Sequence, residues 1–460
     1  MQAFLRALGL LIATTCLVWV AVLWHWQATH RDMSSRDILV YLGALPLTLF
    51  ALLWAARWAW LGASSHLTPP APLAPVPDAP APPAATGASL ALLDAHLLTP
   101  VGDSAAAVLN ALAAGQPRPR LDPGWRDDRG LPVLTARVAS IDDPDEEDAA
   151  LEQVWGTPPP EDVRRTWRLA KRVLQTALQH ESDADPTGAP GLRLSCAWPA
   201  AWAAETVGRA EQALRAWLEH AAPQRPCRID TLGVGPDHAD WSAVEARLQP
   251  LPSPGEPPSL WLLAAHSAVA PEALQRLQDS GLLFSSHRPH GQLPGEAAVL
   301  LRLARPPGTG EPPPPAWTRL YPVATSARLA ESAPAASATR ARTVDLVGLA
   351  LATTALRSPL GGLVSDASPQ GGRTADACAA LQEHGPDLDP LADHQALGAL
   401  CGHLGPCSFP LAIALAAEAA RQTGRPWLAL STSNPAWPQA LALCPEETPP
   451  APARADRPLS

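Results

Sequence analysis

Two uncharged apolar runs, at residues 7–24 and 38–56, open the chain, and later hydrophobic positions come in shorter periodic groups. Each run comes close to the length of about 20 residues that an α-helix needs to cross the core of a bilayer. Tryptophans gather near their ends, among them Trp24, Trp26, Trp58 and Trp60, where amphipathic rings lie at headgroup level. The pattern predicts a transmembrane hairpin over residues 1–63, with the lipid bilayer as its partner.

A cleavable signal peptide is the alternative for the first run, but no small-residue cleavage site follows Trp26. Pro46 predicts a kink in the second span, which neighbouring helices can accommodate in lipid. The arginines that flank the spans balance one another, so the positive-inside rule does not orient the hairpin. Two crossings place both chain ends on one side of the membrane.

Residues 64–86 are rich in proline and alanine and contain no basic residue. Such a segment favours extended polyproline II and predicts a semi-rigid spacer between membrane and domain. A compositional bias of the genome is the alternative, since only Lys171 among 34 basic residues is a lysine. The last residues, 447–460, are predicted to be a disordered tail.

Between residues 87 and 446 the hydrophobic period alternates between that of strands and that of helices. Strands are predicted at 90–96, 131–141, 192–196, 228–234, 260–265, 297–303, 320–325, 363–366, 427–431 and 440–444. Helices are predicted at 105–114, 163–180, 203–220, 271–278, 343–356, 374–383 and 407–422, with Asp103 or Ser104 capping the first.

The proline-rich segment 308–317 divides this pattern into two consecutive α/β halves. The fold class is therefore α/β, a layered fold with helices around and between the sheets, preceded by two transmembrane helices. The alanine-rich stretch 411–420 has few charges and is typical of a helix buried in the central layer.

Composition narrows the function. An apolar fraction of 47% is enough to bury a core, and a net charge of −10 with a pI near 5.7 argues against a nucleic-acid partner. Seven cysteines without a regular framework are typical of buried thiols in a reducing compartment. They favour a cytoplasmic location for the soluble domain.

Three sequence segments resemble the β-ketoacyl synthases of the thiolase-like superfamily. The segment 92–115, LLDAHLLTPVGDSAAAVLNALAAG, resembles the family's opening strand, Thr-Pro-x-Gly turn and first helix. The segment 293–303, LPGEAAVLLRL, resembles its Gly-Glu-x-Ala strand, and 401–416, CGHLGPCSFPLAIALA, resembles its Gly-His-x-x-Gly loop and buried helix. They occur in the family's order, so the resemblance implies a thiolase-like domain over 87–446 and a homodimer.

The sequence departs from this family at the residues that carry its chemistry. The catalytic cysteine of the family would fall at 233–236, where no cysteine stands, and its first histidine would follow 363–366, where no histidine stands. Only His403 matches, as the second histidine. Without thiol and partner it cannot run acyl transfer by the family's mechanism, so the resemblance implies a catalytically silent protein without a cofactor.

For the other reactive side chains, a role in packing is the alternative to a role in catalysis or metal binding. Cys196, at a predicted strand end, is the alternative nucleophile, whereas Cys227 is predicted to lie in the core. Cys401, His403 and Cys407, with His384 and His394 upstream, have the residue types of a zinc site but lack its spacing, so no metal is predicted. Glu296 is expected to be a structural acid, and His287 and His290 an exposed loop.

Two functions follow. The first is a silent scaffold or accessory component of a bacterial envelope assembly, with protein partners, in the inner membrane; the resemblance of this layout to accessory components of type VI secretion clusters suggests that system. The second is an acyltransferase using Cys196 or His403, or a protein that binds acyl chains or acyl carriers. An open cavity reaching His403 would favour the second function, and a filled one the first.

Overall fold

The computed structural model describes residues 89–447, apart from 143–147, 185–190, 233, 236–237, 240, 249–257, 309–315, 326–337, 355, 357, 369–371 and 434–437. The chain divides into two compact units, Met1–Ala81 and Pro82–Ser460. In the first unit Thr15, Trp19, Trp24 and Thr48 are described, each in a helix. The rest of the predicted spans, the linker 64–86 and the tail after Glu447 lie outside the described residues. Within the described residues, no helix has both the length and the apolarity to cross a membrane.

The amino-terminal half of the second unit contributes five strands to the main sheet. They are β1 (Leu90–Leu98), β4 (Leu192–Ala197), β5 (Cys227–Thr231), β8 (Ser259–Ser267) and β9 (Glu296–Ala304). In space they lie in the order β5-β4-β8-β9-β1. Strands β5, β4 and β8 are parallel, whereas β9 runs antiparallel to both β8 and β1.

The carboxy-terminal half repeats this topology. Its strands are β10 (Ala316–Leu320), β12 (Gly362–Ser365), β13 (His394–Ala396), β14 (Trp427–Ser431) and β15 (Gln439–Glu447), in the spatial order β13-β12-β14-β15-β10. Numbered within their own half, both sets read 3-2-4-5-1, with the fifth strand antiparallel to its neighbours. The short strand β11 (Ala324–Thr325) adds to β15. The two halves are therefore a structural repeat, joined by antiparallel pairing of β1 with β10.

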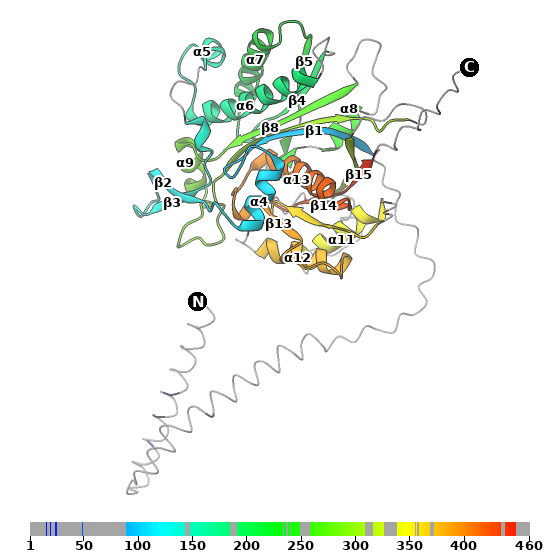
Figure 1. Ribbon diagram of the computed structural model, residues 1–460. Coiled ribbons are helices and arrows are strands. Elements are labelled where there is room, and N and C mark those ends of the chain that lie inside the picture. Colours follow the sequence, from blue (N-terminus) through cyan, green and yellow to red (C-terminus); the bar gives the residue numbers. More distant parts are fainter. Residues whose placement is uncertain are drawn as a thin grey trace, which may run out of the picture. The chain divides into compact units, whose positions relative to one another are not determined.

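Helices form layers outside and between the two halves of the sheet (Figure 1). The helices α5 (Ala149–Trp155), α6 (Glu161–Ala184), α7 (Ala204–Ala221) and α9 (Pro271–Asp279) belong to the amino-terminal half, and α11 (Ala338–Ala352) and α12 (Arg373–His384) to the other. Between the halves lie α4 (Ala105–Ala114), α8 (Trp241–Leu248) and α13 (Ser408–Thr423). Two small hairpins lie outside the main sheet, β2 (Arg120–Arg126) with β3 (Pro132–Thr135) and β6 (Val234–Gly235) with β7 (His238–Ala239).

Strand β9 contributes side chains to two hydrophobic layers, one on each face of the sheet. Val299 and Leu301 point into the central layer with α13, whereas Ala298 and Leu300 point to the outer layer with α6. A strand covered on both faces reads as a continuous apolar run, because successive side chains point to opposite sides. The helix α13 is buried almost along its whole length, as predicted for 411–420, because it packs between both halves.

Most predicted elements are confirmed within one to a few residues, including the Ser104 cap, whose side chain accepts from Ala107 N. The single strand predicted over 131–141 is wrong: β3 ends at Thr135 and a 3-10 turn follows at Ala139–Ile141. The chain leaves the hairpin there because Val138 N donates to the buried Glu296 carboxylate at 2.7 Å.

Three other predicted boundaries are also wrong. The strand predicted over 320–325 divides into β10 and β11, because Pro322 has no N–H for the ladder. The strand predicted over 228–234 ends at Thr231 in β5. The helix predicted over 343–356 spans Ala338–Ala352 in α11.

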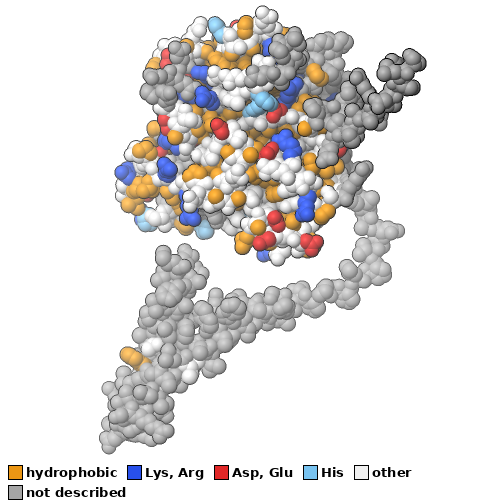
Figure 2. Space-filling model, in the orientation of Figure 1, with side chains coloured by type: hydrophobic (Ala, Val, Ile, Leu, Met, Phe, Trp, Pro, Cys, Tyr) orange, Lys and Arg blue, Asp and Glu red, His pale blue; other side chains and the backbone are white. Residues whose placement is uncertain are grey.

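The surface mixes side-chain types. On the face in Figure 2, basic and acidic side chains are interspersed among hydrophobic and uncharged ones. Salt bridges between neighbouring side chains contribute to this mixture, for example Arg209 with Glu205 along α7 and Arg421 with Glu418 along α13.

The strand β9 begins beside the loop 401–403, and Gly295 makes this close approach. A Cβ at Gly295 would lie 2.0 Å from the carbonyl oxygen of Cys401. We expect Gly295→Ala to lower the free energy of unfolding by about 1–3 kcal/mol, because backbone would have to shift. Urea unfolding measures the loss, and Gly208→Ala, where a Cβ meets nothing within 4 Å, is the control. Equal stability of both variants would contradict the close packing of these two segments.

Candidate functional site

His403, the matched family position, and Asp366, at the start of the loop where the first histidine would be expected, line one small cavity. It is lined by residues from three segments, His290–Leu293, Asp366–Arg373 and Gly402–Ser408, together with Ser433. The cavity holds about 70 Å³. Asp366 follows β12 and His403 precedes α13, so the ends of two parallel strands and the start of the buried helix form its walls.

Asp366 opens the loop in which the resemblance places the first histidine, and its carboxylate is held by the chain that follows β14. It accepts hydrogen bonds from Ser431 Oγ at 2.5 Å, Ser433 Oγ at 2.6 Å and Thr432 N at 2.6 Å. Ser433 N adds a contact at 3.2 Å. A buried carboxylate with this many donors ties two strand ends together, and its lone pairs are used within the protein.

His403 is positioned by its backbone. Its N–H donates to Leu293 O at 2.7 Å, and Gly402 before it has a φ of 71°. A Cβ at Gly402 would meet Leu293 O at 2.7 Å, so both conformation and space require glycine here. The Gly-His pair therefore fixes how the loop passes β9, a structural role that does not depend on the imidazole.

A second histidine lies beside His403 that the sequence analysis did not single out. The His266 ring, at the end of β8, lies 6.0 Å from the His403 ring in an edge-to-face arrangement. Neither His266 ring nitrogen has a hydrogen-bond partner among the described residues. Burial, with a smaller contribution from His403, lowers the pKa of His266 to about 3, so the ring is neutral at physiological pH.

The segment that would carry the catalytic cysteine approaches this loop. Between β5 and α8, the short strand β7 contacts the 3-10 turn Gly405–Cys407 and α13. Gly233 and Pro236 lie outside the described residues, and β6 consists of Val234–Gly235. The helix after it, α8, has 8 residues, whereas its counterpart in the second half, α13, has 16. The two halves therefore differ in the length of this helix.

The thiols near the cavity are buried in packing positions. Cys401 and Cys407 are fully buried, and Cys407 Sγ donates to Ala297 O at 3.3 Å. Burial raises the pKa of Cys401 to about 12 and that of Cys407 well above its usual value. A thiol held in the protonated form is a poor nucleophile.

Cys196, the alternative nucleophile, lies within β4 and points into the outer core against α6 and α7. Burial raises its pKa well above the usual value, and it does not line the cavity at His403. Cys227 begins β5, where it is half-buried at the margin of the same core. The structure thus places both cysteines in packing environments.

Glu296 is the centre of a buried ionic network. Its carboxylate accepts from Arg165 Nε at 2.9 Å and Nη2 at 2.7 Å, and from Ser267 Oγ at 2.7 Å. Burial alone would lower the pKa of Arg165, but Glu296 and Asp142 raise it above its usual range. The network joins β9, α6 and the end of β8, which agrees with a structural acid.

The residues considered for zinc are used separately. His384 Nε2 lies 2.9 Å from Val344 O, and His394 contacts Ser365 Oγ at 2.7 Å and Cys378 Sγ at 3.4 Å. Among the described residues, the group whose atoms could jointly hold a metal ion is instead Asp94, His96 and His180. The Asp-x-His spacing on a strand was the sequence signal for it, but the third member comes from a helix 84 residues further along the chain.

Comparison with protein-family models and with curated proteins gives no match. Solved structures do match over most of the chain. The ishigamide ketosynthase/chain length factor is 15% identical with a TM-score of 0.52, covering 78% of this chain and 99% of that one. A β-ketoacyl synthase from Burkholderia phymatum STM815 is 11% identical with a TM-score of 0.53, covering 78% and 100%. The ketosynthase from module 1 of the bacillaene synthase from Bacillus amyloliquefaciens FZB42 is 12% identical, with a TM-score of 0.50 and coverage of 81% and 75%.

The chain has a thiolase-like fold. The expected layered α/β architecture of two halves is confirmed by these neighbours together with the repeated 3-2-4-5-1 topology. At such low identity the likeness concerns the fold, and the chemistry has to be argued from the residues around His403.

Proposed function

We propose that this chain is a catalytically silent, ketosynthase-like protein, anchored in a bacterial inner membrane by the hairpin at 7–24 and 38–56. It serves as a scaffold or accessory component of an envelope or secretion assembly, with type VI secretion as the named candidate. The observation that carries the proposal is the cavity at His403. Its volume is about 70 Å³, and no thiol is among its described lining residues.

The chemistry of the side chains around this cavity supports the proposal that the protein is catalytically silent. Acyl transfer requires a thiolate near a base and near donors for the developing oxyanion. Here the loop that would carry the first family histidine contains none and opens with Asp366, whose oxygens are engaged by residues 431–433, and the neighbouring thiols of Cys401 and Cys407 are buried. At the described positions His403 thus has no reactive thiol beside it, and the histidine that does lie beside it is the buried His266 of β8, not one in the loop after β12.

The size of the cavity weighs against acyl binding as well. Pockets for drug-sized or cofactor-sized ligands typically hold about 300–1,000 Å³. A cavity of about 70 Å³ accommodates one or two water molecules, and large neighbours such as Leu293 and Arg373 line it. An open cavity reaching His403 would favour acyl binding, and a filled one a scaffold. The small cavity therefore favours the scaffold function.

A homodimer is part of the proposal. The strand β5 lies at one end of the main sheet, paired with β4 on one side. Its Arg228 and Thr231 are exposed, and an exposed strand edge offers unpaired N–H and C=O groups to another chain. Antiparallel addition of a second β5 would continue the sheet across a two-fold axis. Sedimentation of the full chain in detergent tests this state, and a monomer would remove the dimer from the proposal.

Silence is tested by a condensation assay on the full-length chain. With acetyl and malonyl thioesters as substrates, we expect no carbon–carbon bond formation above the uncatalysed background, because the part of the chain that the structure describes offers no activated thiol at the cavity. The His403→Ala variant should give the same background. Product that forms with the natural chain and disappears in His403→Ala would overturn the silent reading.

The anchor is tested separately. We expect the full-length chain to stay with the membrane fraction after alkaline carbonate extraction, because two apolar spans leave lipid at high cost. Reporter fusions at the C-terminus then determine the side on which the domain lies. Release of the chain by carbonate would contradict the membrane anchor. It would not bear on whether the protein is catalytically silent.

A further inference from the structure

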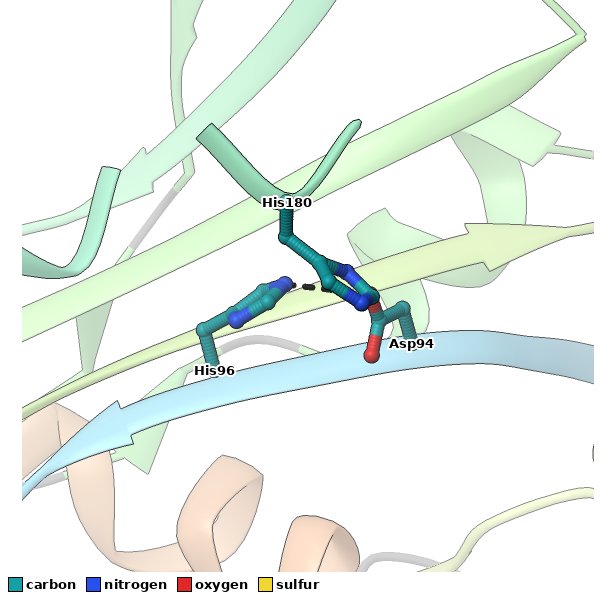
Figure 3. A group of neighbouring side chains, drawn as sticks. All are labelled: Asp94, His96 and His180. Atoms are coloured by element: carbon teal, nitrogen blue, oxygen red, sulfur yellow. Dashed lines mark hydrogen bonds and ion pairs between the residues drawn. The ribbon is translucent and has the colours of Figure 1, made fainter. Parts of the chain in front are cut away.

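A group of three metal-ligating side chains lies on the far side of the sheet from the cavity at His403. Asp94 and His96 come from β1, and His180 comes from the last turns of α6 (Figure 3). His96 Nε2 lies 3.0 Å and His180 Nδ1 lies 3.1 Å from the same carboxylate oxygen, Asp94 Oδ2. One atom of each residue therefore falls within 4.8 Å of the others.

A β-bulge in β1 creates this arrangement. Before the bulge, Leu90 and Leu92 point into the central core. The register with β9 shifts between Leu92 and Asp94, so Leu93 is an extra residue. After the shift it is Leu97 that faces the central core, and the even-numbered Asp94 and His96 face α6. In a regular strand Asp94 and His96 would share the face of Leu90 and Leu92, inside the apolar layer.

Re-aiming side chains next to a site is a common use of a β-bulge. Here the bulge places a carboxylate and an imidazole two residues apart on one face of a strand, opposite an imidazole from a helix. Asp94 Oδ1 accepts from Ala95 N at 2.8 Å, which orients the carboxylate so that Oδ2 faces both histidines. Burial alone would raise the pKa of Asp94, but the hydrogen bond and charge of His96 outweigh it and hold that pKa at about 2.

A cavity of about 320 Å³ adjoins the three side chains. Trp261 and Leu300 form part of its wall, and Glu181 and Arg302 line it as well. Glu181 is already neutralised, since its two oxygens lie 2.5 Å from Arg225 Nη1 and 3.2 Å from Arg302 Nη1. Asp94 is thus the carboxylate in this cavity that has histidines, and no arginine, as its ion-pair partners.

We propose that Asp94, His96 and His180 form a binding site for a divalent first-row transition metal ion, with Zn²⁺ as the favoured occupant. Two imidazoles and one carboxylate are ligands that suit zinc and its neighbours in the series. Three protein ligands leave a coordination position free, and the adjoining cavity offers room for water or a small ligand there. The side chain of His180 is 65% exposed, so the ion can enter from solvent.

The proposal is independent of the silent ketosynthase-like function, because it uses the outer face of the sheet. Its test uses the full-length chain in detergent, stripped of metal by a chelator and dialysed. We expect the chain to bind one Zn²⁺ in equilibrium dialysis, and Asp94→Asn, His96→Gln and His180→Gln each to weaken that binding by more than about tenfold. Cysteines are unchanged in every variant, so zinc held by thiols cancels in the comparison.

The matched control is His220→Gln. His220 is an exposed histidine near the end of α7, as His180 is near the end of α6, and its Nδ1 contacts Ala216 O of its own helix. We expect this variant to bind zinc as the natural chain does. Zn²⁺ should also raise the melting temperature of the natural chain and of His220→Gln, but not of His180→Gln, whose exposed position keeps the fold intact.

Two results would overturn the metal site. One is equal zinc binding by the natural chain and the three site variants. The other is a lower melting temperature of the site variants without zinc, combined with no effect of zinc on any chain, which would identify the group as a hydrogen-bonded cluster only.

Discussion

Glu296→Ala is expected to lower the free energy of unfolding by about 3–5 kcal/mol, because the buried Arg165 guanidinium loses its buried carboxylate and keeps only Asp142, which is partly exposed. Arg165 is 4% exposed and Glu296 is fully buried, so water cannot replace the lost carboxylate. Ser267 Oγ and Val138 N would lose their acceptor as well. Small domains are stable by about 5–15 kcal/mol, so this variant should unfold at much lower urea concentration.

The control for this network is Arg209→Ala. Arg209 pairs with Glu205 on the exposed side of α7, at 2.6 Å, and exposed pairs of this kind contribute at most about 0.5 kcal/mol. Urea unfolding followed by circular dichroism compares the two variants. If Glu296→Ala and Arg209→Ala cost the same, the buried network does not hold β9 to α6 as the structure indicates.

Phe409→Ala is expected to cost about 3–5 kcal/mol, the usual range for deleting a fully buried aromatic side chain. Phe409 lies at the start of α13, is 1% exposed, and contacts Trp241 of α8 edge to face at 5.7 Å. It therefore joins the two helices that follow the third strand of each half. Its loss opens a cavity in the central layer, where both halves meet.

Chemical unfolding again measures the effect, with Leu391→Ala as the control. Leu391 is 87% exposed, so its removal should change stability by less than about 0.5 kcal/mol. A Phe409→Ala variant as stable as the control would mean that the central layer does not carry the cohesion of the two halves.

The elements of this fold could be predicted because their hydrophobic periods are local. The run 297–303 and the alanine-rich stretch 411–420 are apolar apart from Arg302 and Glu418, and all their other residues are buried in the structure. The pairing order 3-2-4-5-1 could not be read in the same way, because it joins segments far apart in sequence. It was not part of the prediction, which gave two consecutive α/β halves, and it comes from the structure.

The boundaries that were predicted wrongly have tertiary causes. The chain turns away after Thr135 because a buried carboxylate 158 residues later accepts the N–H of Val138. A sequence window contains no trace of that partner. Pro322, by contrast, was a local signal for a break between β10 and β11, and a stricter use of it would have found both strands.

For the site residues, too, local signals could be predicted from the sequence and tertiary contacts could not. His403 was placed correctly on a loop, and Asp366 was predicted as the last residue of a strand that ends at Ser365. The hydrogen bonds that occupy Asp366 come from residues 431–433 and depend on the alignment of β12 with β14. His266 was overlooked because a single histidine in a buried strand has no sequence signature. The group at Asp94 was overlooked because the bulge that turns it outward is a property of pairing with β9.

The measurement that tests silence most directly is the mass of the intact full-length chain after incubation with an acyl thioester, beside an active ketosynthase as a positive control. The account predicts that the control gains one acyl group and that this chain gains none, because the thiols at Cys196, Cys401 and Cys407 are buried and held protonated. A stable gain of one acyl group that is lost when one of these cysteines is replaced by serine would contradict it.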